Sequence, residues 1–198
     1  MTQPKLYMIM GPNGAGKTTS AFKLLPNRLS MDEFVNADEV ARGLSPFNTD
    51  GQSVAAGRLM LQRINDLIEA RKSFAFETTG ASHFGSVLDN AKAAGYRLGL
   101  VYLWLPSADL AKLRVRLRVA QGGHNISADD IERRYKRGLH NLINLYLPLA
   151  DEASIFDSTL PITGEPELLA QKNGAEWQVY KPDVWDRIQK AAEESGHE

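Results

Sequence analysis

Residues 11–18 constrain the fold of this chain more than any other segment. They read Gly-Pro-Asn-Gly-Ala-Gly-Lys-Thr and match the pattern G-x-x-x-x-G-K-[ST] in full. Glycines let a backbone approach phosphate closely, and the N–H groups of such a loop form an anion-binding concavity at a helix N-terminus. The apolar run Leu6–Met10 precedes the motif, and an amphipathic segment follows it. This context indicates a P-loop that binds a nucleoside triphosphate, rather than a chance turn.

The residue types in the motif predict specific roles. Lys17 is expected to place its charge on the β- and γ-phosphates and to act in catalysis, and the Thr18 hydroxyl is expected to bind Mg²⁺. The predicted nucleotide-binding residues are Gly11, Pro12, Asn13, Gly14, Ala15, Gly16, Lys17, Thr18 and Thr19. The expected cofactors are therefore ATP and Mg²⁺.

Short apolar runs alternate with amphipathic stretches along the rest of the chain. After the first strand, runs typical of strands lie at residues 33–36, 73–78, 98–105 and 154–157. Strands that alternate with helices predict an α/β fold, here a P-loop NTPase with a five-stranded, mainly parallel sheet and helices on both faces. A length of 198 residues suits one domain, and we assign residues 1–198 to it.

The C-terminal end of the chain shows two further patterns. Trp177–Tyr180 has the pattern of an edge strand, and Pro182 suits the first position of a terminal helix. Residues 176–198 are therefore expected to form a C-terminal strand and helix extension.

Residues 107–140 interrupt the alternation with two predicted helices, and we interpret them as a helical lid. Ser107 and Ser127 are the predicted N-caps. One expected core-facing stripe is Leu110, Leu113 and Leu117, and the other is Ile131, Tyr135, Leu139, Leu142 and Tyr146.

The lid is also the most basic part of the chain. Eight basic and three acidic residues lie between Lys112 and Arg137, in a chain whose net charge is −1. Such a cluster suits a compact anion such as a triphosphate, although two solvated helix faces would look the same. Arg118 and Arg134 lie nearest the turn between the helices, and we predict that they are catalytic residues that clamp the γ-phosphate.

Two carboxylates follow predicted strands, where ligands bind in parallel sheets. Asp38 could accept the proton of a substrate hydroxyl, or it could cap a helix that begins near Glu39. Glu77 could organise Mg²⁺ and its waters, could bind substrate hydroxyls, or could be an ordinary acid at a strand end. Glu77, Thr78 and His83 are the predicted substrate-binding residues.

Composition excludes several classes of site. The chain has no cysteine, so it holds no disulfide, no thiolate nucleophile and no zinc–thiolate site. A net charge of −1 argues against general binding of nucleic acid. The apolar run Leu6–Met10 is too short to span a membrane. We expect a soluble, cytoplasmic protein without a nucleic-acid or membrane partner.

Taken together, these motifs resemble the zeta-toxin family of P-loop kinases, and more closely its chromosomal relatives, once labelled predicted ABC-type ATPases. The matching segments are GPNGAGKTT (Gly11–Thr19), VNADEVA (Val35–Ala41), GLSPF (Gly43–Phe47), AGRLML (Ala56–Leu61), FAFETT (Phe74–Thr79), GGHNI (Gly122–Ile126), ERRYKRGL (Glu132–Leu139) and IFDS (Ile155–Ser158). An ABC-type ATPase is not expected, because the chain is short and has no LSGGQ-like signature.

The resemblance implies both a topology and an activity. Its sheet order would be 2-3-1-4-5, and the reaction would be transfer of the ATP γ-phosphate to a hydroxyl of UDP-N-acetylglucosamine. It implies that Asp38 is the general base, that Glu77 is an acidic substrate-binding residue, and that Arg118 and Arg134 are the lid arginines. Asp157-Ser158 lacks the asparagine that the toxins have between these two residues.

Two alternatives to this function stay open. One is a kinase for another nucleotide or metabolite, since the acceptor site and not the fold sets the substrate. The other is a nucleotide-binding, toxin-like module that a small antitoxin protein controls.

Overall fold

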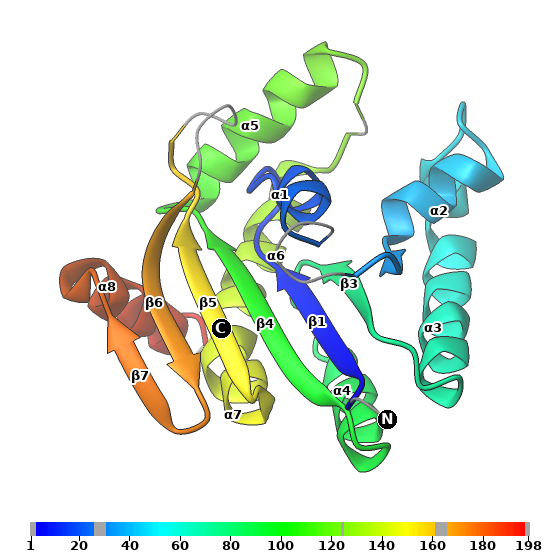
Figure 1. Cartoon of the computed structure of the whole chain (residues 1–198). Helices are drawn as coiled ribbons and strands as arrows, with labels where there is room; N and C mark the ends of the chain where they lie inside the picture. Colours follow the sequence, from blue (N-terminus) through cyan, green and yellow to red (C-terminus); the bar gives the residue numbers. More distant parts are fainter. Residues whose placement is uncertain (1–2, 26–30, 124, 161–165, 197–198) are drawn as a thin grey trace.

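The apolar runs form one seven-stranded sheet (Figure 1). The computed structural model describes residues 3–25, 31–123, 125–160 and 166–196. The strands are β1 (Lys5–Met10), β2 (Phe34–Val35), β3 (Phe74–Thr78), β4 (Arg97–Trp104), β5 (Glu152–Asp157), β6 (Glu167–Asn173) and β7 (Glu176–Val179). Their order is β2-β3-β1-β4-β5-β6-β7.

The first five strands confirm the predicted parallel order 2-3-1-4-5. The sheet is wider than predicted, because β6 and β7 add an antiparallel hairpin beside β5 and make the sheet mixed. The β6 segment Glu167–Asn173 was missed because its apolar run is short and its second half is polar. The predicted edge strand at Trp177–Tyr180 is β7, displaced by one residue.

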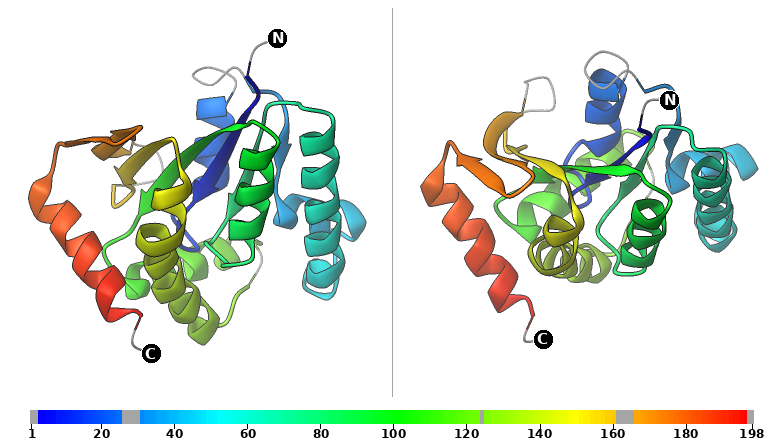
Figure 2. Two further views of the ribbon diagram at one scale, coloured as in Figure 1. Left: turned by 90° about the horizontal axis from the view of Figure 1, so that it is seen from below. Right: turned by 60° about the horizontal axis from the view of Figure 1, so that its bottom comes forward.

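Helices cover both faces of the sheet, as predicted (Figure 2). They are α1 (Lys17–Leu24), α2 (Ala37–Leu44), η2 (Asp50–Gln52), α3 (Ser53–Glu69), α4 (Phe84–Ala93), α5 (Ala108–Ala120), α6 (Ala128–Asn141), η3 (Leu142–Tyr146), α7 (Leu147–Leu149) and α8 (Pro182–Glu194). None of the described helices is long and apolar enough to cross a membrane.

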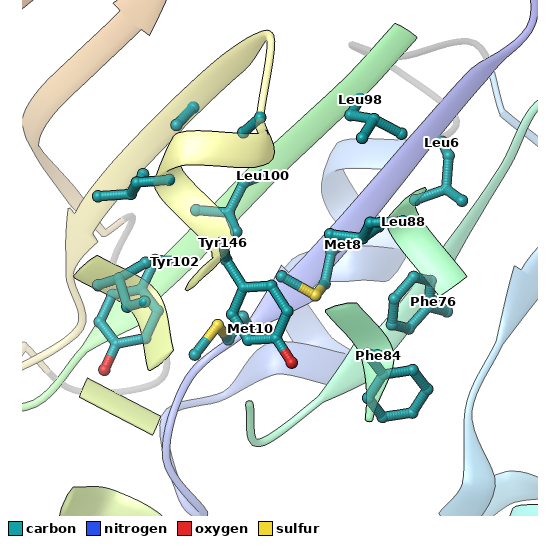
Figure 3. Close-up of a cluster of buried hydrophobic side chains, with 14 of the residues drawn as sticks. Leu6, Met8, Met10, Phe76, Phe84, Leu88, Leu98, Leu100, Tyr102 and Tyr146 are labelled. Carbon is teal, nitrogen blue, oxygen red and sulfur yellow. The ribbon is translucent and has the colours of Figure 1, made fainter. Parts of the chain in front are cut away.

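Two hydrophobic cores reflect the two layers of helices. Side chains of α3, α4, α6, η3 and α8 pack on one face of the sheet, around strand residues that include Met8 and Phe76 (Figure 3). Side chains of α1 and α5 pack on the other face, around Ile9 and Leu103. Neighbouring residues of one strand therefore belong to different cores, because successive side chains point to opposite faces.

The apolar stripe predicted for α5 is wrong at two of its three positions, since only Leu110 packs against the core. Leu113 and Leu117 are 44% and 57% exposed, and α5 instead buries Ala111 and Val115. The small residues let α5 lie close to the sheet, and the larger leucines are left outside. The predicted caps are present, since Ser107 Oγ accepts from Leu110 N and Ser127 Oγ accepts from Asp130 N.

The second predicted stripe is largely buried. Ile131, Leu139, Leu142 and Tyr146 are each at most 2% exposed, and Tyr135 is half-buried. The helix changes to a π-helix at Leu142–Tyr146. Ile131 packs in the core with α1 and α5, whereas Leu139, Leu142 and Tyr146 pack in the other core. Helix α6 therefore contacts both cores, and it lies against the backbone just after β3.

Candidate functional site

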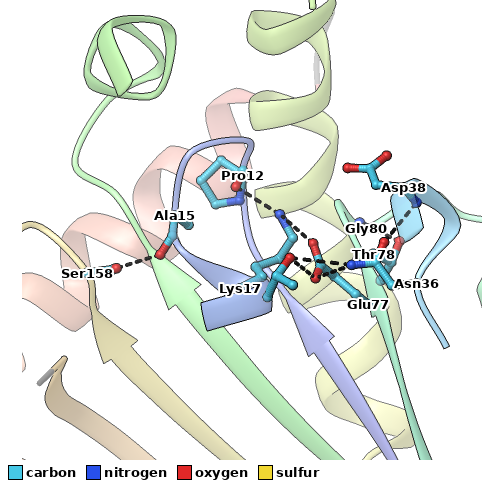
Figure 4. A network of polar contacts seen from close by, with 10 residues as sticks. Pro12, Ala15, Lys17, Asn36, Asp38, Glu77, Thr78, Gly80 and Ser158 are labelled. Carbon is cyan, nitrogen blue, oxygen red and sulfur yellow. Dashed lines mark hydrogen bonds and ion pairs between the residues drawn. The ribbon is translucent and has the colours of Figure 1, made fainter. Parts of the chain in front are cut away.

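The parallel strands bring the predicted site residues to one edge of the sheet. The P-loop begins directly after β1, Asn36 follows β2, Glu77 lies at the end of β3, and Ser158 follows β5. Because the carboxyl ends of parallel strands share an edge, segments more than a hundred residues apart in the chain meet there. Figure 4 shows them around the P-loop.

The P-loop ends in the first turn of α1. Gly16 precedes the helix with a φ of +81°, and the first N–H groups of α1 have no partner within the helix. The N–H of Ala15 donates to Pro12 O at 3.2 Å, which tightens the loop. Free N–H groups at a helix N-terminus attract an anion, so the backbone geometry fits phosphate.

Glu77 is the centre of the polar network at this site (Figure 4). Its Oε2 accepts hydrogen bonds from Thr18 Oγ1 at 2.7 Å and from Asn36 Nδ2 at 2.9 Å. Its Oε1 lies 3.6 Å from the ammonium of Lys17, which also donates to Pro12 O at 3.1 Å. One carboxylate therefore holds both functional side chains of the P-loop.

Asn36 joins this network and also caps a helix. Its Oδ1 accepts from Asp38 N at 2.8 Å, so Asn36 is the N-cap of α2. The alternative in which Asp38 itself caps the helix is wrong, because Asp38 lies inside the first turn. The carboxylate of Asp38 is exposed, and Figure 4 shows it outside the hydrogen-bond network on the side of the Lys17 ammonium. Sequence reasoning missed Asn36, although the Asn-x-Asp spacing contained the signal.

The three predicted substrate-binding residues point in different directions. Glu77 faces the P-loop, whereas Thr78 is buried and its Oγ1 accepts from Gly80 N at 3.0 Å. The two side chains diverge because they are neighbours on one strand. His83 is exposed at the start of α4, where its ring lies 4.3 Å from the ring of Phe84. Desolvation, and to a smaller degree the nearby charge of Arg137, lower the pKa of His83.

Helix α6 packs directly on the backbone after β3. A Cβ added to Gly138 would lie 2.7 Å from Thr79 O, a distance that side chains do not tolerate. Asn141 Nδ2 donates to Gly80 O at 2.7 Å, close to the same contact. Arg134 lies four residues before Gly138, about 6 Å along the helix axis. The packing of Gly138 thus brings the arginines of α6 to the end of β3.

We expect Gly138→Ala to destabilise the fold by about 1–3 kcal/mol, because the added methyl group overpacks this contact. Urea unfolding of the purified protein measures the change. Gly57→Ala is the matched control, since Gly57 lies within α3 with no atom within 4 Å of an added Cβ. That variant should be neutral or more stable by up to about 1 kcal/mol. Equal effects of the two substitutions would contradict the close backbone packing.

The basic residues of α6 fall into two groups. Arg133 and Lys136 pair with Asp130 and Glu132 of the same helix, as solvated surface charges do. Arg134 and Arg137 are half-buried, and within the described ranges no carboxylate lies at ion-pair distance from either. The cluster therefore contains both ordinary surface pairs and arginines available to an anion.

Arg137 was not among the predicted site residues. Its Nε is buried and has no hydrogen-bond partner in the described part of the chain. Burial lowers the pKa of Arg137, as do the charges of Arg133 and Arg134 to a smaller degree. A bound anion would relieve this crowding of like charges.

Arg118 lies in the last turn of α5, beside the turn that leads to α6. A Cβ added to Gly123 would lie 2.6 Å from Arg118 Cγ, so the side chain packs against that turn. Lys112 of α5 and Glu132 of α6 form an ion pair at 2.6 Å. Helices α5 and α6 are thus tied to each other, and Arg118 and Arg134 lie on separate helices.

The donor groups of the site suit Mg²⁺ better than a metal held by protein alone. Among the residues described, no three His, Cys, Asp or Glu side chains group as metal ligands. Thr18 and Glu77 offer two hard oxygen ligands beside the phosphate cradle. Mg²⁺ commonly takes one or two protein oxygens together with substrate phosphates and water, so the residues present fit this ion.

A strand–P-loop–helix unit in a parallel sheet, with a buried lysine and a threonine held by a carboxylate, defines a P-loop nucleotide-binding protein. The profile of a family described as an AAA domain matches residues 6–138, which is more than half of the chain. The chain belongs to this family.

Individual known proteins are also similar to this chain in sequence or in structure. An uncharacterized protein of Haemophilus influenzae is 27% identical over 137 residues, which cover 67% of this chain and 94% of that one. The complex AvrRxo1-ORF1:AvrRxo1-ORF2 with sulphate ions has a TM-score of 0.71 at 16% identity and has also been solved with ATP. The match covers 94% of this chain but only 64% of the longer AvrRxo1 chain.

The chromosomal toxin–antitoxin system PezAT of Streptococcus pneumoniae has a TM-score of 0.65 at 14% identity. The match covers 100% of this chain and 89% of the PezAT chain. The fold is therefore an α/β P-loop NTPase-like fold with a mixed sheet, which confirms the predicted fold class.

Proposed function

We propose that this protein is an ATP- and Mg²⁺-dependent kinase that transfers the γ-phosphate to a hydroxyl of a small molecule. The observation that carries the proposal is the network in which Glu77 holds Lys17, Thr18 and Asn36, with Asp38 beside it. It combines a phosphate cradle, groups for Mg²⁺ and a free carboxylate, which are the parts that phosphoryl transfer requires.

Each of these side chains would have its own role in the reaction. Lys17 neutralises charge on the β- and γ-phosphates, and Thr18 and Glu77 hold Mg²⁺ directly or through water. Asp38 accepts the proton of the attacking hydroxyl. Arg118 and Arg134 close on the phosphates and stabilise the charge that spreads over the transferred group. His83 and Arg137 border the side on which the acceptor would enter, beyond the end of β3.

UDP-N-acetylglucosamine is the first acceptor to test, because the motifs resemble those of zeta toxins. Likeness to the PezAT structure supports the fold and leaves the choice of acceptor open. Another nucleotide or metabolite is the alternative, since the residues that would contact the acceptor differ from one kinase to the next.

The test measures ATP consumption with Mg²⁺, with and without UDP-N-acetylglucosamine, for the wild type and Asp38→Asn. We expect acceptor-dependent turnover that falls by about 10²-fold in the variant, because general-base catalysis contributes at least that much. ATP affinity should stay within about twofold, since Asp38 lies outside the P-loop. Asp66→Asn, on the exposed side of α3, is the matched control and should behave as wild type.

Two outcomes of this test revise the proposal. Turnover that ignores this acceptor would remove the sugar-nucleotide assignment and call for a screen of other hydroxyl-bearing metabolites. If ATP binds but no acceptor supports turnover, and Asp38→Asn changes nothing, the kinase proposal fails. A nucleotide-binding module controlled by an antitoxin would then be favoured, as the likeness to PezAT also suggests.

A further inference from the structure

The side chain of Arg114 joins the lid helix α5 to two loops of the candidate site. Nη1 donates to Ser158 O at 2.7 Å and to Gly14 O at 3.4 Å. Nη2 donates to Thr159 O at 3.0 Å and to Leu160 O at 3.1 Å. All four acceptors are backbone carbonyls, so the guanidinium fixes the course of the chain rather than pairing with one side chain.

Other contacts close the same junction. Ser158 Oγ donates to Ala15 O at 2.7 Å, which ties the loop after β5 directly to the P-loop (Figure 4). Gly14 has a φ of +79°, and a Cβ there would lie 2.9 Å from Arg114 Cβ and 3.2 Å from Ala111 O. The first half of α5 is thus fixed to the P-loop, whatever movement the lid makes beyond it.

The order of the strands indicates which part of a bound nucleotide would lie beside this junction. Glu77 lies near the end of β3, on one side of β1, whereas Ser158 follows β5, on the other side beyond β4. Thr18 and Glu77 mark the side on which Mg²⁺ and the γ-phosphate are proposed to bind. A triphosphate that lies along the P-loop therefore directs its nucleoside toward Ser158–Leu160. Leu160 is 59% exposed there and offers an apolar surface to a base.

We propose that Arg114 is a positioning residue, which holds Ser158–Leu160 against the P-loop as the wall on which the nucleotide base rests. This inference rests on the proposed function, since it assumes that ATP is the nucleotide. Arg114 would then set the affinity for the nucleoside part of ATP, whereas the affinity for its phosphates depends on the P-loop itself.

Arginine suits this role for a geometric reason. The planar guanidinium presents donors on two nitrogens in fixed directions and can reach three successive carbonyls together. A lysine ammonium is a single point donor and cannot span them. Burial lowers the pKa of Arg114, while the charge of Asp157 raises it, and the carbonyl contacts compensate for lost hydration.

The experiment compares the binding of two ligands, ATP and inorganic tripolyphosphate, to the full chain with Mg²⁺ by calorimetry. We expect Arg114→Met to weaken the affinity for ATP by about tenfold or more, because the variant loses a charged donor to several carbonyls. Tripolyphosphate has no base, and its affinity should change by less than about threefold. Arg114→Lys should fall between Arg114→Met and the wild type. Arg116→Met is the matched control, because Arg116 is exposed on the same helix.

The outcomes separate this inference from the proposed function. Unchanged ATP affinity in Arg114→Met, or an equal loss for both ligands, would overturn the positioning role. If Arg114→Met does not fold, Arg114→Lys tests the inference instead. It must weaken the affinity for ATP by at least about threefold and leave the affinity for tripolyphosphate unchanged. Failure of the wild type to bind ATP would instead overturn the proposed function.

Discussion

Lys17→Met is expected to lower ATP turnover by at least about 10³-fold, because one preorganised charge on the transferred group has that value in phosphoryl transfer. The Lys17 side chain is only 6% exposed, and it is held between Pro12 O and Glu77 beside the phosphate cradle. Methionine has a similar length but no charge. The substitution therefore removes the cation without creating a large cavity.

The measurement is ADP release with the acceptor that the wild type uses, or basal hydrolysis if none is found. Lys190→Met, on the exposed side of α8, is the matched control and should retain wild-type turnover. Turnover of Lys17→Met within about tenfold of wild type would show that the P-loop does not carry the chemistry.

Glu77→Gln is expected to lower turnover by a similar factor of about 10³, because it removes the carboxylate beside the proposed metal position. Glu77 accepts from Thr18 and Asn36 and faces the Lys17 ammonium. A glutamine amide would turn an N–H₂ donor toward some of these donors. We also expect the Mg²⁺ concentration for half-maximal turnover to rise by about tenfold, since one hard anionic ligand is lost.

The Glu77→Gln experiment is a Mg²⁺ titration of ATP turnover, with urea unfolding as a check on the fold. Stability should fall by about 1–3 kcal/mol, because buried donors lose a charged acceptor. Glu69→Gln, exposed at the end of α3, provides the control. An unchanged Mg²⁺ requirement with full turnover would remove Glu77 from the metal site and leave it a structural role.

Much of the fold could be predicted from the sequence because its signals are local. The P-loop needs particular glycines, a lysine and a threonine in fixed order, and a strand and a helix flank it in the chain. Strands buried on both faces, such as β4, appear as continuous apolar runs. The β6 strand gave no such signal, since half of it is polar and it lies beyond the parallel strands, antiparallel to β5 and β7.

The apolar pattern of α5 in the sequence was misleading. Leu113 and Leu117 formed the stronger stripe in sequence, but Ala111 and Val115 face the sheet. Helix α5 lies so close to the P-loop that a Cβ added to Gly14 would lie 2.9 Å from Arg114 Cβ and 3.2 Å from Ala111 O. Only small side chains fit between them. Sequence periodicity describes one helix and does not contain the shape of the surface that the helix must fit.

The sequence by itself determined the class of this protein, because nucleotide binding by a P-loop depends on residues that are consecutive in the chain. Tertiary structure alone decided which distant residues complete the site. It brought Asn36 and Glu77 to Thr18, separated the arginines of α6 into surface pairs and available charges, and placed Arg114 across three carbonyls after β5. These contacts depend on strand order and helix packing, which bring together residues that no local pattern relates.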